Sequence, residues 1–266
     1  MDMKNTHTNQ TSTEKHNGKK ILIVLFTCAF ISVLVFLSIM ATKYRWFEKE
    51  SNSFSISDDS RSARDILEYD GVDTVVLNNN RPDFTEYDLQ NITGENYSDL
   101  DSLGRCGAAV ALLDYSMMPT EPRGEIGDVR PSGWRQEKYP GVVNSEPPYL
   151  YNRCHLIAYM FTGQNANEKN LITGTRYFNT ELMLPIENRV AQYLYGEDTP
   201  DFHGNYKHVL YRVTPHFKDN ELVARGVEIE ALSVEDNGEA LSIHVFIYNI
   251  QPGIVINYET GESCEE

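Results

Sequence analysis

The chain has 266 residues and a formal net charge of −16 at pH 7, from 23 basic and 39 acidic side chains. This length accommodates one catalytic domain with appendages. Four cysteines are too few for a disulfide scaffold, and so acidic a chain is not expected to bind nucleic acid tightly over its whole surface.

The charge is unevenly distributed along the sequence. Residues 123–189 carry 8 basic and 7 acidic residues, whereas 51–122 and 190–266 each carry 4 basic and 14 acidic residues. A cleft responds to its local field rather than to the net charge of the protein. The segment 123–189 is therefore the part of the folded chain that would not repel a phosphate backbone.

The N-terminal residues predict a membrane anchor. Residues 1–20 are polar and typical of a disordered tail, whereas 21–41 form an uncharged apolar run long enough to cross a bilayer at about 1.5 Å per residue. The run is long for a signal peptide, and the bulky MATKYRW that follows is a poor cleavage site, which favours an uncleaved anchor over a removed signal or a buried helix. Residues 42–62 then form a stalk.

Basic residues flank the apolar run on both sides, four before it and three just after it, so the positive-inside bias is slight. We expect a short tail inside the cell and a large domain outside. This arrangement makes the protein a single-pass protein of the cell membrane with an extracellular domain.

Residues 63–260 predict one folded domain that mixes strands and helices. Short β-branched or small apolar runs indicate strands at 72–77 and 106–115. The Gly- and Pro-rich stretch 119–134 predicts a long structured loop, and such loops inside compact domains usually serve a function. A further strand is expected at 149–157.

The second half of the domain predicts a helix followed by three strands. The helix is expected at 175–195, where Pro185 should kink it or start its second half, and its apolar stripe comprises Leu182, Ile186, Val190 and Leu194. Strands follow at 208–213, 222–229 and 241–250, with a turn at 234–239. This order predicts an α+β fold on an antiparallel sheet, followed by an acidic tail at 261–266.

The stretch from Tyr151 to Glu187 concentrates the residues that can carry chemistry. His155 is a candidate general base, because imidazole titrates near neutrality. Asn179 offers a hard oxygen ligand that suits Mg²⁺, since this ion keeps several waters and needs few protein ligands. Arg153 is a cation compatible with phosphate, and Glu187, about 80° from Asn179 on a regular helix, could orient a water. The set suits Mg²⁺-assisted hydrolysis of a phosphodiester.

Each of these residue types also has an ordinary structural role. A histidine after a strand is more often structural than catalytic, and an asparagine most often caps a helix or bonds to the backbone. A glutamate on a helix often makes a surface salt bridge. The catalytic interpretation is favoured because all of these residues occur within one short segment.

The runs NRCHLIAYMFTG, NEKNLITGTRYFN and LPIEN resemble the DNA/RNA non-specific endonucleases, whose ββα-metal (His-Me finger) site begins with an Asp-Arg-Gly-His motif. The resemblance extends from about Asp101 to Tyr258 and is greatest to a Gram-positive branch of secreted DNases and membrane-bound DNA-entry nucleases. It implies a ββα-metal core on a central antiparallel sheet. It also implies an endonuclease that hydrolyses DNA and RNA without sequence preference and uses Mg²⁺, with Mn²⁺ as an alternative ion. No protein partner is implied.

The resemblance assigns a role to each residue of the motif. It places His155 on the general base, Arg153 on the motif arginine and Asn179 on the sole protein ligand of the magnesium. Asn170 falls on a second asparagine that supports the site or contacts phosphate. Glu187 falls on the glutamate that holds a metal-bound water.

Two positions depart from the family motif. Asn152 replaces the aspartate, so no carboxylate there can raise the basicity of the site, and Cys154 replaces the glycine, which adds bulk beside the base. Neither change removes a group that does chemistry, so activity is expected at a rate that these changes could lower. Candidates for phosphate contacts outside the motif, each with solvent exposure as the alternative, are Arg123, Arg130 and Arg176.

Other functions compete with this interpretation. A cysteine hydrolase using Cys154 and His155 is disfavoured, because adjacent residues of a strand point to opposite faces. A non-catalytic, membrane-anchored module that binds nucleic acid or a partner would suit the acidic surface, but the complete motif opposes it. A zinc site is disfavoured because no Cys/His pairs occur at ligand spacing. Cys106 could pair with Cys154, although two buried free thiols are the favoured state.

Overall fold

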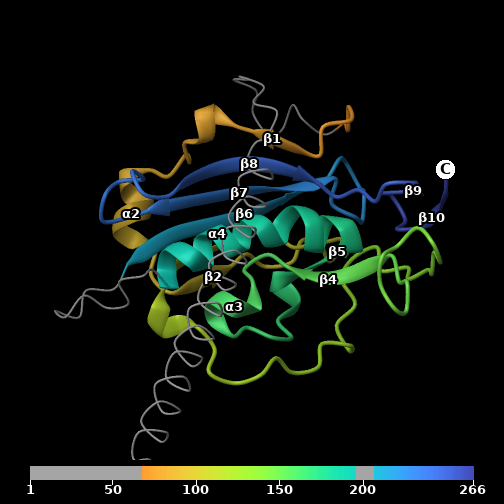
Figure 1. Ribbon diagram of the computed structural model, residues 1–266, viewed down its shortest axis with the longest axis horizontal. Helices are drawn as coiled ribbons and strands as arrows, with labels where there is room; N and C mark the ends of the chain where they lie inside the picture. The colour runs from red at the N-terminus through yellow and green to blue at the C-terminus, as the bar shows by residue number, and fades with distance from the viewer. Residues whose placement is uncertain (1–67, 196–206) are drawn as a thin grey trace, which may run out of the picture. The chain divides into compact units, whose positions relative to one another are not determined.

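The computed structural model describes residues 68–195 and 207–266, which form an α+β unit (Figure 1). The remaining residues, 1–67 and 196–206, lie outside the described residues, and with them the expected anchor at 21–41 and the stalk at 42–62. Across the described ranges, no helix is long and apolar enough to cross a bilayer.

The elements follow one another in a mixed order. The strands are β1 (Thr74–Val76), β2 (Glu95–Tyr97), β3 (Ala109–Asp114), β4 (Tyr151–His155), β5 (Leu171–Thr175), β6 (His208–His216), β7 (Gly226–Ser233), β8 (Ser242–Tyr248), β9 (Ile254–Ile256) and β10 (Ser263–Glu265). The α-helices are α2 (Glu86–Asn91), α3 (Tyr159–Thr162) and α4 (Leu184–Tyr195). The π-helix is η5 (Phe178–Met183), and the 3₁₀ turns are η2 (Asn78–Asn80), η3 (Tyr115–Met117) and η4 (Glu168–Asn170).

The predicted antiparallel sheet is confirmed. Six strands pair in the order β1-β8-β7-β6-β3-β2, and each neighbouring pair is antiparallel. Strand β3 alternates buried and partly buried residues, and Ala109, Ala111 and Leu113 face the main core. The apolar stripe of α4 belongs to the same core, with Val190 and Leu194 buried, so the helix lies against this face of the sheet (Figure 1).

The opposite face of the sheet is partly covered by the segment between β1 and α2. Val75 of β1 and Leu77, just after it, pack there on Phe246 and Tyr248. A polar network lies beside this cluster, and its central residue is Glu228, which pairs with both His216 and His244. Charged side chains of three neighbouring strands are thus satisfied by one another on the face that the segment between β1 and α2 partly covers.

The β4–β5 hairpin is a separate two-stranded sheet, so other contacts must fix it to the central sheet. Asn249, fully buried just after β8, makes three of these contacts. Its amide donates to the main-chain oxygens of Thr173 and Ala224, each at 3.0 Å, and its oxygen accepts from the Thr175 N–H at 2.9 Å. Because the hydrogen-bonding groups of this buried amide all have partners, Asn249 holds β5 in a fixed position relative to β8.

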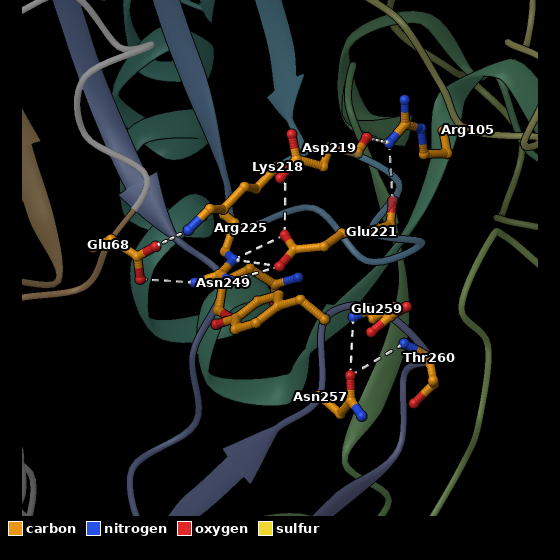
Figure 2. Close-up of polar contacts among 11 residues, drawn as sticks. Glu68, Arg105, Lys218, Asp219, Glu221, Arg225, Asn249, Asn257, Glu259 and Thr260 are labelled. Atoms are coloured by element: carbon orange, nitrogen blue, oxygen red, sulfur yellow. Dashed lines mark hydrogen bonds and ion pairs between the residues drawn. The ribbon is translucent and has the colours of Figure 1, made fainter.

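Figure 2 shows the loop that connects β6 to β7, together with Asn249. Arg225 donates to Glu221 through Nη2 at 2.5 Å, and its guanidinium lies 4.6 Å from the centre of the Tyr258 ring. Glu68 pairs with Lys218 at 2.5 Å on the exposed side of the loop, where an ion pair contributes little. The Leu222 oxygen of this loop accepts from the Ser132 hydroxyl at 2.6 Å, which fixes the end of the Gly- and Pro-rich loop 119–134.

Several predicted boundaries differ from those observed. Strand β7 begins at Gly226 rather than 222, because residues 218–225 form the loop just described. Strand β5 was not predicted as a strand from its sequence pattern, since its residues are all buried and do not alternate. Residues 261–266 are not a separate tail: Ser263–Glu265 pairs with Ile254–Ile256, which satisfies its backbone groups. The turn at 234–239 is confirmed.

Candidate active site

Hairpin β4–β5 and the helix that follows it form a ββα unit. In the hairpin His155 pairs with Leu171, so the candidate base lies at the end of β4 nearest the connecting segment. His155 is only 7% exposed. The chain then turns from β5 into η5 and α4, which places Asn179 and Glu187 over the hairpin. One cavity of about 670 Å³ is lined by His155, Asn179 and Glu187.

The hydrogen bonds of His155 define its tautomer. Nε2 lies 2.9 Å from the main-chain oxygen of Asn165, and because a carbonyl only accepts, Nε2 carries the proton. Nδ1 therefore keeps its lone pair, 3.3 Å from the Arg123 guanidinium. Burial lowers the pKa of His155 to about 4, and Arg123 adds to this shift while the Asn165 oxygen opposes it. The imidazole is thus neutral at neutral pH, as a general base requires.

Asn170 does not reach the cavity. It is fully buried, and its amide makes two hydrogen bonds with the backbone of Ile157: its oxygen accepts from the N–H at 2.8 Å, and its nitrogen donates to the carbonyl at 2.9 Å. These bonds fix the turn that directly follows His155. Of the two roles expected for Asn170, the geometry favours support of the site over contact with phosphate, because both ends of its amide are occupied by the Ile157 backbone.

A π-helical turn aligns Asn179 with Glu187. The N–H of Leu184 donates to the oxygen of Asn179, five residues earlier, rather than four as in an α-helix. One extra residue in the helix makes a spacing of eight equivalent to a spacing of seven, which leaves the two residues about 20° apart instead of about 80°. The sequence pattern predicted helix here but not the π turn.

Glu187 is a buried carboxylate without a partner. Its exposed fraction is 8%, and no hydrogen bond or ion pair from the described residues satisfies it. Burial raises the pKa of Glu187 to about 8, and the nearby Arg123 charge opposes this shift. A buried carboxylate facing a polar cavity is a group that a cation would compensate. With the Asn179 amide on the same helix face, it forms a set of hard oxygen donors that fits Mg²⁺.

The motif arginine, Arg153, organises the loop beside the cavity. Its Nε donates to the oxygen of Val129 and its Nη2 to that of Gly127 at 2.6 Å. Its guanidinium also stacks on Trp134, 4.2 Å from the ring centre. Arg153 lines the cavity, yet two of its donors are already committed to the loop, so its contacts position loop 119–134 against β4.

The three arginines expected to contact phosphate fall into two groups. Arg123 and Arg176 line the cavity, which allows either to meet a phosphate there. Arg130 is not among the lining residues, although its charge contributes, after burial, to the lowered pKa of Arg153. The loop that carries Arg123 is tied to the ββα unit by Asn165, whose amide donates to the Glu125 oxygen at 3.0 Å.

The cysteine that replaces the motif glycine is accommodated by a glycine on the opposite strand. Cys154 is fully buried, and a Cβ added to Gly174 would collide with its sulfur and with the Phe178 ring. Burial raises the pKa of the Cys154 thiol, which argues against a thiolate nucleophile. Cys106 and Cys154 are both buried free thiols, as expected.

A second cluster of metal-type side chains lies on the far face of the sheet and lacks a free ligand atom on its histidine. Asp83, Glu230 and His244 approach one another there. The Nδ1 of His244 meets the Arg81 oxygen at 2.7 Å, and its Nε2 meets Glu228 at 2.6 Å. Both partners accept, so both ring nitrogens donate and neither can bind a metal.

A buried neutral histidine, an asparagine amide and an unpaired carboxylate line one cavity on a ββα unit, an arrangement of groups that could hold a divalent metal ion beside a base. Residues 85–235 match the DNA/RNA non-specific endonuclease family, and the chain belongs to that family. The predicted family is thus confirmed. The residues before position 85, including those that cover the far face of the sheet, lie outside the matched region.

Known relatives agree with the predicted Gram-positive branch. The chain is 32% identical over 117 residues to a deoxyribonuclease of Streptococcus dysgalactiae subsp. equisimilis. This alignment covers 42% of the chain and 32% of the relative, so the chain spans about a third of the length of the curated relative that it matches.

Two solved structures share the fold. NucA from Streptococcus agalactiae with a magnesium ion bound superposes with a TM-score of 0.55 at 24% identity, over 71% of this chain and 85% of that one. The Sda1 nuclease with a bound zinc ion superposes with a TM-score of 0.53 at 26% identity, over 66% and 82%. Both are nuclease structures with a metal ion, and their likeness extends over most of the described residues.

Proposed function

We propose that the protein is a metal-dependent endonuclease that hydrolyses the phosphodiester backbone of DNA, and of RNA, with little sequence preference. The observation that carries the proposal is the meeting of the unprotonated Nδ1 of His155, the Asn179 amide and the unpaired Glu187 carboxylate around one cavity. Family membership and the deoxyribonuclease relative support it. Backbone hydrolysis needs no reading of base edges, which agrees with the lack of sequence preference.

In this mechanism His155 Nδ1 accepts the proton of a water that attacks the phosphorus, and the bond from phosphorus to the 3′ oxygen breaks. A Mg²⁺ ion held by Asn179 would stabilise the negative charge that develops on the phosphoryl group and on the leaving oxygen. Glu187 would orient water beside the ion. Arg123 and Arg176 would bind the phosphate, and Arg123 would have to leave Nδ1 for His155 to act.

The first prediction concerns the reaction itself. The full-length protein with Mg²⁺ is expected to nick and then degrade plasmid DNA, and to degrade RNA, because the site contains a base and oxygen ligands and hydrolysis of the backbone requires no reading of base edges. Agarose gels would follow both substrates with and without excess EDTA. Cleavage that persists in EDTA would refute the metal mechanism, and Mn²⁺ in place of Mg²⁺ would test the alternative ion.

We further propose that the enzyme works outside the cytoplasm while tethered through residues 21–41. The apolar run supports this arrangement, whereas Lys43, Arg45 and Lys49 weaken the charge bias. Treating intact cells with protease should degrade the domain while a cytoplasmic control protein survives. A domain that persists until the membrane is broken would have the opposite topology.

A further inference from the structure

The active-site cavity extends beyond the proposed catalytic residues to a wall formed by two aromatic side chains and a proline. Trp134, Pro147 and Tyr149 line the same cavity as His155. Tyr149 is 40% exposed, although it directly precedes buried residues that lead into β4. We propose that Tyr149 forms a subsite that stacks an unpaired nucleobase of the substrate strand. This inference rests on the proposed function and specifies how that site holds its substrate.

The backbone under Tyr149 is rigid. Tyr149 forms an antiparallel bridge with Lys138, and its N–H donates to the Pro147 oxygen at 2.9 Å. The next residue, Leu150, is fully buried and donates from its N–H to the Glu137 oxygen at 3.0 Å. A ring on such a backbone loses little conformational freedom when a ligand packs on it, which favours binding.

Four aromatic side chains line the cavity, Trp134, Tyr149, Tyr151 and Tyr159, and of these only Tyr149 is exposed over more than a third of its surface. One face of Trp134 is covered by the Arg153 guanidinium at 4.2 Å, and that arginine is held by the loop. The Lys138 ammonium lies 4.9 Å from the centre of the Tyr149 ring, and Lys138 does not line the cavity. The ammonium can cover only one face of the ring, so the other face is left for a base.

The polar groups that line the cavity beside Tyr149 favour a base over a phosphate, and the Lys138 ammonium near the ring is not part of that lining. Glu146 lines the cavity there, and its carboxylate would repel a phosphate. Gln136 is occupied, because its amide donates to the Tyr151 oxygen at 2.6 Å and accepts from the Tyr151 N–H at 2.8 Å. The Ser145 hydroxyl donates to the Pro147 oxygen at 3.0 Å. Stacking tolerates any base, so this subsite agrees with cleavage that is not sequence-specific.

The position of Tyr149 along the chain limits which nucleotide it can contact relative to the phosphate that is cleaved. It precedes His155 by six residues, which in extended backbone corresponds to at most about 20 Å. A base on Tyr149 therefore belongs to a nucleotide at most a few positions away from the phosphate that is cleaved. Since a paired base inside a duplex cannot stack on a side chain, the subsite should act on single strands and on frayed ends.

The test compares single-stranded and duplex oligonucleotides of one sequence as substrates of the full-length protein. Stacking on an aromatic side chain corresponds to about 5–150-fold in affinity. Tyr149→Ala should raise KM for the single strand by about this factor with kcat little changed, and the ratio of kcat/KM for single strand to duplex should fall. Tyr149→Phe should retain the ratio. The matched control is Tyr87→Ala, since Tyr87 is 73% exposed on α2 and does not line the cavity.

A binding measurement distinguishes failure of the subsite from failure of the proposed function. A single strand containing 2-aminopurine, mixed with the protein in EDTA, should lose fluorescence on binding, and Tyr149→Ala should weaken this quenching. If cleavage is metal-dependent and Tyr149→Ala has the same ratio of kcat/KM for single strand to duplex as the wild type, the subsite alone is overturned. Quenching that depends on Tyr149 in a protein that cleaves nothing would support the subsite and overturn the proposed function.

Discussion

Replacing His155 with alanine is expected to lower the rate of phosphodiester cleavage about 10²- to 10⁴-fold, which is the usual contribution of a positioned general base. The physical reason is the loss of Nδ1, which carries a lone pair rather than a proton because Nε2 donates to the Asn165 oxygen. The measurement is single-turnover cleavage of plasmid DNA at saturating Mg²⁺. Thermal unfolding of the variant is the control for loss of fold.

The His155→Gly variant gives a second, more specific test of the general base. His155→Gly leaves a space into which free imidazole can diffuse, so added imidazole should restore part of the rate. The same imidazole should not restore a variant that lacks a different group of the site, such as Asn179→Ala. Wild-type rates in the alanine variant would refute the assignment of His155 as the base.

The lowered pKa of His155 predicts how the activity and the stability of the wild type change with pH. Since burial lowers the pKa of His155 to about 4, the acid limb of kcat/KM should lie nearer pH 4 than the ordinary value of about 6.5. Between those values the folded state binds fewer protons than the unfolded state, so this residue makes stability fall as the pH falls from 6.5 to 4. Circular dichroism at each pH separates lost activity from unfolding. An acid limb near pH 6.5 would contradict a buried, neutral His155.

Replacing Asn179 with alanine is expected to lower the cleavage rate at least about a hundredfold, because stabilisation of developing charge by a metal ion is worth several kcal/mol. Extra Mg²⁺ should not restore the rate, since the protein ligand itself is gone. Binding of Mn²⁺ to the protein without substrate, followed by electron paramagnetic resonance, gives a readout that does not depend on activity. An Asn179→Ala variant that titrates like wild type in both assays would place the ligand elsewhere.

Glu187→Ala is the matched comparison on the same helix. A group that orients water beside the ion contributes about 10–100-fold to metal affinity or activity. The variant should therefore need more Mg²⁺ but recover much of its rate at high concentration, unlike Asn179→Ala. Equal behaviour of the two variants would mean that both residues contact the ion directly or that neither does.

Several features followed from local sequence. The apolar stripe at 182–194 predicted the core face of α4, and Val190 and Leu194 are indeed buried. The Gly/Pro content of 119–134 predicted its loop. The family followed from the resemblance of the sequence around His155 to the DNA/RNA non-specific endonucleases. Strand β5 was missed because Leu171–Thr175 is buried on every residue and carries no alternating pattern.

The roles of individual site residues required the fold. Without the resemblance, residue type alone does not distinguish Asn170 from Asn179, yet one is fully buried on the Ile157 backbone and the other lines the cavity. Arg153 and Arg123 are both cations in the same segment, but Arg153 holds loop carbonyls whereas Arg123 reaches the base. Such differences depend on contacts between residues 10 to 40 positions apart, which local patterns do not encode.

The sequence by itself determined which groups are available: an imidazole, two amides and a carboxylate within one segment, because chemistry depends on residue type. Only the tertiary structure decided how they meet. The pKa of His155 is lowered and that of Glu187 raised because packing removes water from both. The π turn at Asn179 brings two helix positions onto one face. Each of these effects arises from burial and backbone geometry, and none is a property of a residue and its sequence neighbours alone.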